Sequence, residues 1–284
     1  MKKSETCCRT PFPGIFQNIP IFAKMNKALN NTFQLQGPVG NQATQLLLPP
    51  GFNKETGKCD LVILMHGFLG SMTGAPMGFL GKLFPHHGYA VLRFDFDGYG
   101  HSEGTQEGNT VPKMIEDAQV MYDYARKLPF VNRVILLGHS QGGVVASMLS
   151  GRLEKAGTPP DGLILMAPAS VIKDFALKGR FFTTRCNPQN PPESVNVYGF
   201  HIGREYILTA QTLPIEEESS WFTGPVLLLH GTWDIVVPPV YSKRYHALYR
   251  NSELHFIRWT EHIFLFFRRS LRRHLLEFLS ALSR

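Results

Sequence analysis

The stretch Val134-Ile135-Leu136-Leu137-Gly138-His139-Ser140-Gln141-Gly142-Gly143 decides the fold of this chain. Its apolar first half is typical of a buried strand, and the apolar residues 144–149 behind it favour a helix. The chain must turn sharply between the two, and glycines two residues before and two after Ser140 leave room for that turn. A G-x-S-x-G motif in this context predicts a serine nucleophile exposed at the top of a sheet.

A serine hydroxyl needs a base to take its proton and an acid to orient that base. In the arrangement that the motif predicts, the acid and then the histidine follow the serine along the chain, each after a later strand. Asp234 follows the apolar run Val226–Leu229, and His262 follows Leu254–Ile257. We therefore predict that Ser140, Asp234 and His262 form a catalytic triad.

Other acids and histidines fit these roles less well. Asp95 and Asp97 precede the serine in the chain, so we expect them to stabilise a glycine-rich loop. Asp174 lies in the predicted lid, where we expect a role in substrate binding rather than in the triad. Three histidines on predicted elements are expected to be structural: His230, His246 and His274.

An oxyanion formed at the serine needs hydrogen-bond donors. The backbone N–H of Gln141 is one candidate, since it follows the nucleophile at a helix N-terminus. The second should come from the loop His66-Gly67-Phe68-Leu69-Gly70 after an early strand, and we choose the N–H of Phe68.

The order of apolar runs predicts an α/β fold with a mostly parallel, doubly wound sheet. Residues 33–48 are expected to add one or two antiparallel strands. Strands are predicted at 61–65, 89–94, 134–137, 163–166, 226–229 and 254–257, and helices at 75–87, 111–127, 142–156, 241–250 and 264–283. We expect a single domain over 1–284 with an N-terminal extension at 1–30. Residues 171–222 show no clear strand and are rich in aromatics and proline, which predicts a helical or loop lid insertion.

Composition excludes several classes of protein. The chain has 284 residues, a net charge of +7 and 43% hydrophobic residues. No apolar run is long enough to span a bilayer, and no apolar stretch follows the basic N-terminus, so we expect a cytoplasmic protein without a membrane span. Scattered histidines and the cysteines Cys7, Cys8, Cys59 and Cys186 show no metal-ligand spacing, so no metal and free thiols are expected.

The last seventeen residues supply +4 of the net charge. Leu271, Leu275, Phe278 and Leu282 recur there at helical spacing, which predicts a terminal helix packed on the sheet. We interpret its arginines as a solvated face. A site for anionic membrane or nucleic acid is the alternative, and no aromatic–basic interleaving or nucleic-acid motif supports it. The sequence leaves a homodimer open.

Several segments together resemble the α/β-hydrolase fold, and more narrowly the bacterial cinnamoyl and feruloyl esterases. They are 61–70, 93–102, 138–147, 167–169, 231–238 and 261–264, with the more specific lid segment 206–215. The resemblance implies hydrolysis of feruloyl, coumaroyl or caffeoyl esters without a cofactor. It implies that Tyr206 and Asp174 bind the phenolic hydroxyls of the substrate, with Asp174 one position away from the family's acid.

The lid departs from the family pattern. Phe175 and Phe182 stand where the family has an acid and an amide, which favours a more apolar acyl pocket, and Trp233 before the acid would narrow the site. The main prediction is a serine esterase for hydroxycinnamoyl esters that works through an acyl-enzyme. The alternative is a general short-chain acyl esterase, thioesterase or monoacylglycerol lipase-like hydrolase. A non-enzymatic binding module is the rival from another class, and the complete triad argues against it.

Overall fold

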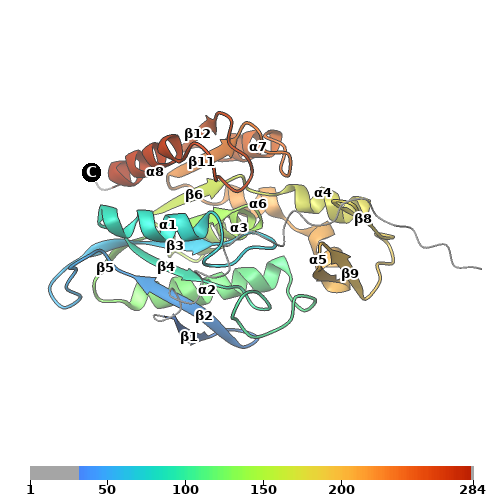
Figure 1. Ribbon diagram of the computed structural model, residues 1–284, viewed down its shortest axis with the longest axis horizontal. Coiled ribbons are helices and arrows are strands. Elements are labelled where there is room, and N and C mark those ends of the chain that lie inside the picture. The colour runs from blue at the N-terminus through green and yellow to red at the C-terminus, as the bar shows by residue number, and fades with distance from the viewer. Residues whose placement is uncertain (1–31, 283–284) are drawn as a thin grey trace, which may run out of the picture. The chain divides into compact units, whose positions relative to one another are not determined.

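The computed structural model describes residues 32–282 of the chain. Within them an eight-stranded sheet has the order β1-β2-β4-β3-β5-β6-β11-β12 (Figure 1). Strands β1 and β2 are antiparallel to each other, β2 is antiparallel to β4, and all other neighbours are parallel. The bounds of the strands are β1 Thr32–Gln36, β2 Asn41–Leu47, β3 Cys59–Met65, β4 Ala90–Phe94, β5 Val131–His139, β6 Gly162–Met166, β11 Val226–Gly231 and β12 Ser252–Ile257.

Helices cover both faces of this sheet because its strands are apolar on both sides. In β3 the side chains of Leu61, Ile63 and Met65 belong to one core, and those of Val62 and Leu64 belong to a second core. The first core is completed by α2, α3 and α7, and the second by α1 and α8. The bounds of these helices are α1 Met77–Leu83, α2 Val111–Lys127, α3 Gln141–Lys155, α7 Val240–Leu248 and α8 Arg268–Leu282.

The sequence predictions for these elements agree closely with the structure. The predicted antiparallel pair is β1 and β2, and the predicted terminal helix is α8, which buries Leu271, Leu275 and Phe278. The helix predicted at 75–87 is shorter, because α1 ends at Leu83 and a 3₁₀ turn, Pro85–His87, follows it. Cys59 and Cys186 are free thiols, whereas Cys7, Cys8 and the extension at 1–30 lie outside the described residues.

The prediction of a lid without strands is wrong. Between β6 and β11 the chain forms two short hairpins, which pair β7 with β8 and β9 with β10. Figure 1 shows them grouped with α4 and α5 at one end of the sheet. The bounds of the lid elements are α4 Val171–Lys178, β7 Arg180–Phe181, β8 Thr184–Arg185, β9 Ser194–Val197, β10 Phe200–Gly203, α5 Arg204–Thr212 and α6 Ile215–Ser220. The strands have two to four residues each, too few to show an apolar period in the sequence.

Beneath the loop that follows β4, the carboxyl group of Asp117 is fully buried on α2 and accepts a hydrogen bond from the N–H of Asp97 at 3.1 Å. Burial and then repulsion by Asp97 raise the pKa of Asp117 to about 8. An aspartate in an unfolded chain titrates near 3.9. The folded state therefore holds a proton that the unfolded state has lost between about pH 4 and 8, and stability falls as the pH rises through that window.

We expect Asp117→Asn to reduce this loss of stability, because asparagine keeps an acceptor for the Asp97 N–H and cannot ionise. Urea unfolding at pH 5 and pH 8 measures the effect. Asp123→Asn, on the same helix and exposed, is the matched control and should keep the wild-type pH dependence. An Asp117→Asn variant with the full wild-type difference between the two pH values would contradict the assignment.

Candidate active site

Ser140 lies between β5 and α3 with φ 55° and ψ −121°, a conformation that side-chain-bearing residues rarely adopt. The turn is packed closely against the loop that follows β3. A Cβ on Gly142 would lie 2.3 Å from the carbonyl oxygen of Met65, and one on Gly67 would lie 2.7 Å from the Cβ of Ser140. The two glycines let the loop after β3 and the serine turn pass each other at contact distance.

The structure brings the three predicted triad residues together. His262 Nε2 is 2.9 Å from Ser140 Oγ, and His262 Nδ1 is 2.7 Å from Asp234 Oδ2. The other carboxylate oxygen of Asp234 accepts hydrogen bonds from the backbone N–H groups of Val236 and Val237. Burial alone would raise the pKa of Asp234, but the hydrogen bonds from His262 and Val237 hold it below its ordinary value. Asp234 is therefore a carboxylate that fixes the tautomer of His262.

His139 is a residue of the site that the sequence analysis did not assign. Its Nε2 is 2.9 Å from the carbonyl oxygen of His262, and the two imidazole rings are 4.8 Å apart. Burial lowers the pKa of His139 to about 3, so its ring is neutral and Nε2–H donates to that carbonyl. His139 thus ties the loop that carries His262 to the serine turn. Its place directly before Ser140 in the motif was the available signal.

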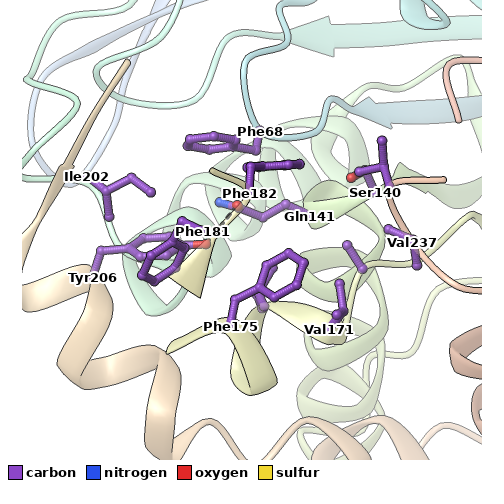
Figure 2. Close-up of a pocket in the computed structure, with 13 residues that line it drawn as sticks. Phe68, Ser140, Gln141, Val171, Phe175, Phe181, Phe182, Ile202, Tyr206 and Val237 are labelled. Carbon is purple, nitrogen blue, oxygen red and sulfur yellow. Dashed lines mark hydrogen bonds between the residues drawn. The ribbon is translucent and has the colours of Figure 1, made fainter. Parts of the chain in front are cut away.

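The donors predicted for the oxyanion lie beside the serine. Gln141 is the first residue of α3, where backbone N–H groups have no acceptor within the helix. Phe68 follows Gly67 in the loop after β3, and both Phe68 and Gln141 line the same pocket as Ser140 (Figure 2). The two N–H groups remain our candidates for the oxyanion hole.

This pocket spans about 410 Å³ including the open solvent at its mouth, and side chains of the lid form part of its lining. The predicted residues Phe175, Phe182 and Tyr206 line it, together with aliphatic side chains such as Ile202 and Val237 (Figure 2). Asp174 lies outside the lining, and its carboxylate accepts a hydrogen bond from the hydroxyl of Tyr241. Trp233 is also outside the lining and 57% exposed, so it does not narrow the pocket as expected.

The competing acids and histidines have structural partners. Asp95 accepts hydrogen bonds from the backbone N–H groups of Met72 and His101, and so joins the loops after β3 and β4. His230 is buried and lies 2.7 Å from Ser242 Oγ and 2.9 Å from the carbonyl oxygen of Val237. Among residues 32–282 no group of three or more acidic, histidine or cysteine side chains could hold a metal ion. No helix in the same residues is long and apolar enough to cross a membrane.

The sheet order, the strained serine turn and the Ser–His–Asp arrangement define the α/β-hydrolase fold. The profile of the family described as "Serine aminopeptidase, S33" matches residues 57–188. Est1E from Butyrivibrio proteoclasticus, solved with ferulic acid bound, superposes with a TM-score of 0.82 at 26% identity and covers 88% of this chain and 99% of its own. The chain belongs to the α/β-hydrolase superfamily and carries the Ser–His–Asp arrangement found in serine hydrolases of that fold.

Two curated relatives are similar to about two thirds of this chain. "Lysophosphatidylserine lipase ABHD12" of Danio rerio is 30% identical over 199 residues, which are 68% of this chain and 48% of the relative. "Protein ABHD12B" of Homo sapiens is 27% identical over 194 residues, 68% of this chain and 50% of the relative. The chain spans about half the length of these curated relatives.

Tyr206 lines the pocket, but its hydroxyl donates to Gln141 Oε1 at 2.9 Å (Figure 2). Tyr206→Phe would weaken the support of the Gln141 side chain, whose backbone carries a candidate oxyanion donor. A buried group that loses a partner costs about 1–3 kcal/mol. We therefore expect kcat/KM to fall by a similar factor, about tenfold, for caffeate, cinnamate and aliphatic esters alike.

The matched control for this prediction is Tyr198→Phe, since Tyr198 is 65% exposed. A loss confined to esters whose acyl ring carries a hydroxyl would instead assign the Tyr206 hydroxyl to the substrate, as the family resemblance implies.

Proposed function

We propose that this serine hydrolase cleaves carboxylic esters of apolar acyl groups through an acyl-enzyme. The observation that carries the proposal is the position of Ser140 Oγ. It lies 2.9 Å from its base, in the wall of a pocket whose other lining is almost wholly aliphatic or phenyl. Binding an acyl group there would place its carbonyl carbon next to the nucleophile.

The geometry supports a two-step mechanism. Ser140 Oγ attacks the ester carbonyl while His262 Nε2 takes its proton, and Asp234 stabilises the imidazolium that forms. The N–H groups of Phe68 and Gln141 would donate to the oxyanion, and each such donor typically contributes ~3 kcal/mol to the stability of the transition state. His262 then protonates the leaving alcohol, and water repeats the sequence on the acyl-enzyme.

The pocket favours an apolar acyl group over a phenolic one. Asp174 is held by Tyr241 outside the lining, and the Tyr206 hydroxyl is engaged by Gln141. Phe175 and Phe182, 5.9 Å apart between ring centres, take the places that the resembled esterases fill with an acid and an amide. The lipase named among the relatives supports the same interpretation, because lipases act on esters of fatty acids.

Hydroxycinnamoyl esters are the second candidate. Est1E, solved with ferulic acid bound, superposes over most of both chains. A flat ring would also pack against the phenyl rings of Phe175 and Phe182, which line the pocket. In this pocket such a substrate would be held by ring contacts rather than by its hydroxyl.

We expect Ser140→Ala to abolish turnover. Loss of a triad nucleophile has lowered kcat by about 10⁶ in a well-studied hydrolase, with a residual rate from binding and oxyanion stabilisation. The assay uses p-nitrophenyl butyrate, together with labelling by a fluorophosphonate probe, which the variant should not take up. Retention of more than about a tenth of the activity would remove Ser140 from this role.

The length of the preferred acyl chain tests the pocket. For p-nitrophenyl esters we expect kcat/KM to rise from acetate to hexanoate, because each buried methylene adds about 0.8 kcal/mol. Phe175→Ser should reduce the hexanoate-to-acetate ratio by about tenfold or more, since one wall of the pocket is lost. Leu208→Ser, an exposed change in the lid outside the pocket, is the control. A ratio unchanged by Phe175→Ser, with ethyl ferulate preferred, would favour the second candidate.

A further inference from the structure

Exposed apolar side chains gather around the loops that carry the triad acid and histidine. Of the fourteen large hydrophobic side chains that are exposed among residues 32–282, nine lie between Trp233 and Phe267. Six of them form what we term the apolar rim, Trp233, Ile235, Trp259, Ile263, Phe266 and Phe267, with exposed fractions between 38% and 96%. Exposed apolar residues scattered singly need no explanation, whereas a concentration of this size marks an interaction surface.

The two loops that carry the rim are joined to each other. They follow β11 and β12, which are parallel neighbours at the edge of the sheet (Figure 1). The N–H of Trp233 donates to the carbonyl of Thr260 at 3.0 Å, and the rings of Trp233 and Trp259 are 4.8 Å apart. The hydroxyl of Thr260 lies 3.4 Å from the carbonyl oxygen of Phe266, which joins the far end of the loop.

The backbone holds this loop in an unusual conformation. Trp259 and Phe267 have φ values of 60° and 54°, in a region that bulky residues rarely adopt. Both side chains are about half exposed there, at 44% and 54%. Strained backbone of this kind persists where the surrounding structure enforces it, and it concentrates at functional sites.

Positive charge borders the rim. Residues 256–282 contain five arginines and two glutamates, a net charge of +3. Arg258 lies over the ring of Trp259 at 5.4 Å, and Arg269 is exposed on α8 two residues after Phe267. One glutamate, Glu261, is engaged through Oε1 by the N–H of Leu265. Arginines beside exposed tryptophan, phenylalanine and isoleucine match the headgroup and acyl layers of an anionic lipid surface.

We propose that the apolar rim, with these arginines, docks the protein on an anionic phospholipid bilayer. Phe266, Phe267 and Ile235 would enter the boundary between headgroups and acyl chains, while the arginines pair with lipid phosphates. Ile235 directly follows Asp234, and Ile263 directly follows His262. Docking would therefore bring the loops of the triad against the bilayer. A symmetric dimer through the same surface would bring its arginines together, which disfavours a second copy as the occupant.

Flotation of the full chain with phosphatidylcholine vesicles, with or without about one third phosphatidylserine, tests the proposal. We expect binding to the anionic vesicles, and this binding should weaken as salt is added. Arg258→Gln with Arg269→Gln should lower the partition coefficient by about 30-fold. Each charge near the surface contributes about 1 kcal/mol to binding, and about 1.4 kcal/mol corresponds to a tenfold change. Phe266→Ser with Phe267→Asn should lower it at least about tenfold, since two phenyl groups leave the interface.

Two matched controls exclude general effects of charge and hydrophobicity. Lys54→Gln with Lys127→Gln removes the same charge from exposed positions far along the chain, and Val39→Ser with Leu208→Ser removes exposed apolar groups outside the rim. Both controls should bind vesicles as the wild type does. All variants should keep the wild-type rate on a water-soluble acetate ester, which separates docking from catalysis.

Two results would overturn the proposal. One is absence of binding to the anionic vesicles, or binding that the rim and arginine variants leave unchanged. The other is a lipid-free dimer, measured by sedimentation, that the Phe266→Ser/Phe267→Asn variant dissociates, because the rim would then be the interface between two copies.

Discussion

The contact on which the active site depends is the passage of the serine turn against the end of β3. Ser140 can hold its left-handed backbone only because Gly67 and Gly142 leave no side chain between the two segments. The same contact positions the hydroxyl of Ser140. It also positions the N–H groups of Phe68 and Gln141, which are the candidate oxyanion donors. The cost of the strained residue, about 1–3 kcal/mol, is small beside the two cores that enclose it.

The sequence was sufficient for this part of the molecule because the constraint is local. A strand, a sharp turn and a helix must follow one another within about fifteen residues, and the glycine spacing is a direct consequence of sterics. Asp234 and His262 could be found at long range for a different reason. Each lies directly after a continuous apolar strand, and parallel strands end at one edge of the sheet, so the order of elements already implies that the three side chains meet.

From the sequence, the lid could be predicted only as an insertion between two strands of the sheet. Its strands are too short to show an apolar period. The sequence also does not identify which polar groups Asp174 and Tyr206 contact. Packing decides between these partners. Asp174 meets Tyr241 of α7, and Tyr206 meets Gln141 of α3, each across more than sixty residues of chain. In this chain the polar groups of Asp174 and Tyr206 are thus engaged by structural partners.

The C-terminal arginines show a related limit of sequence interpretation. The helical period of Leu271, Leu275 and Phe278 correctly places α8 on the sheet, and it leaves the arginines in solvent. The helical spacing of apolar residues does not show that the loop before α8, which has no regular structure, exposes its own apolar side chains next to these arginines. The two features meet only in the folded chain, where β12 and the start of α8 bracket His262. The apolar acyl pocket is then consistent with the apolar, basic surface around the triad loops. A substrate with an acyl group that fits the pocket would concentrate in a bilayer, and the surface suits docking on such a bilayer.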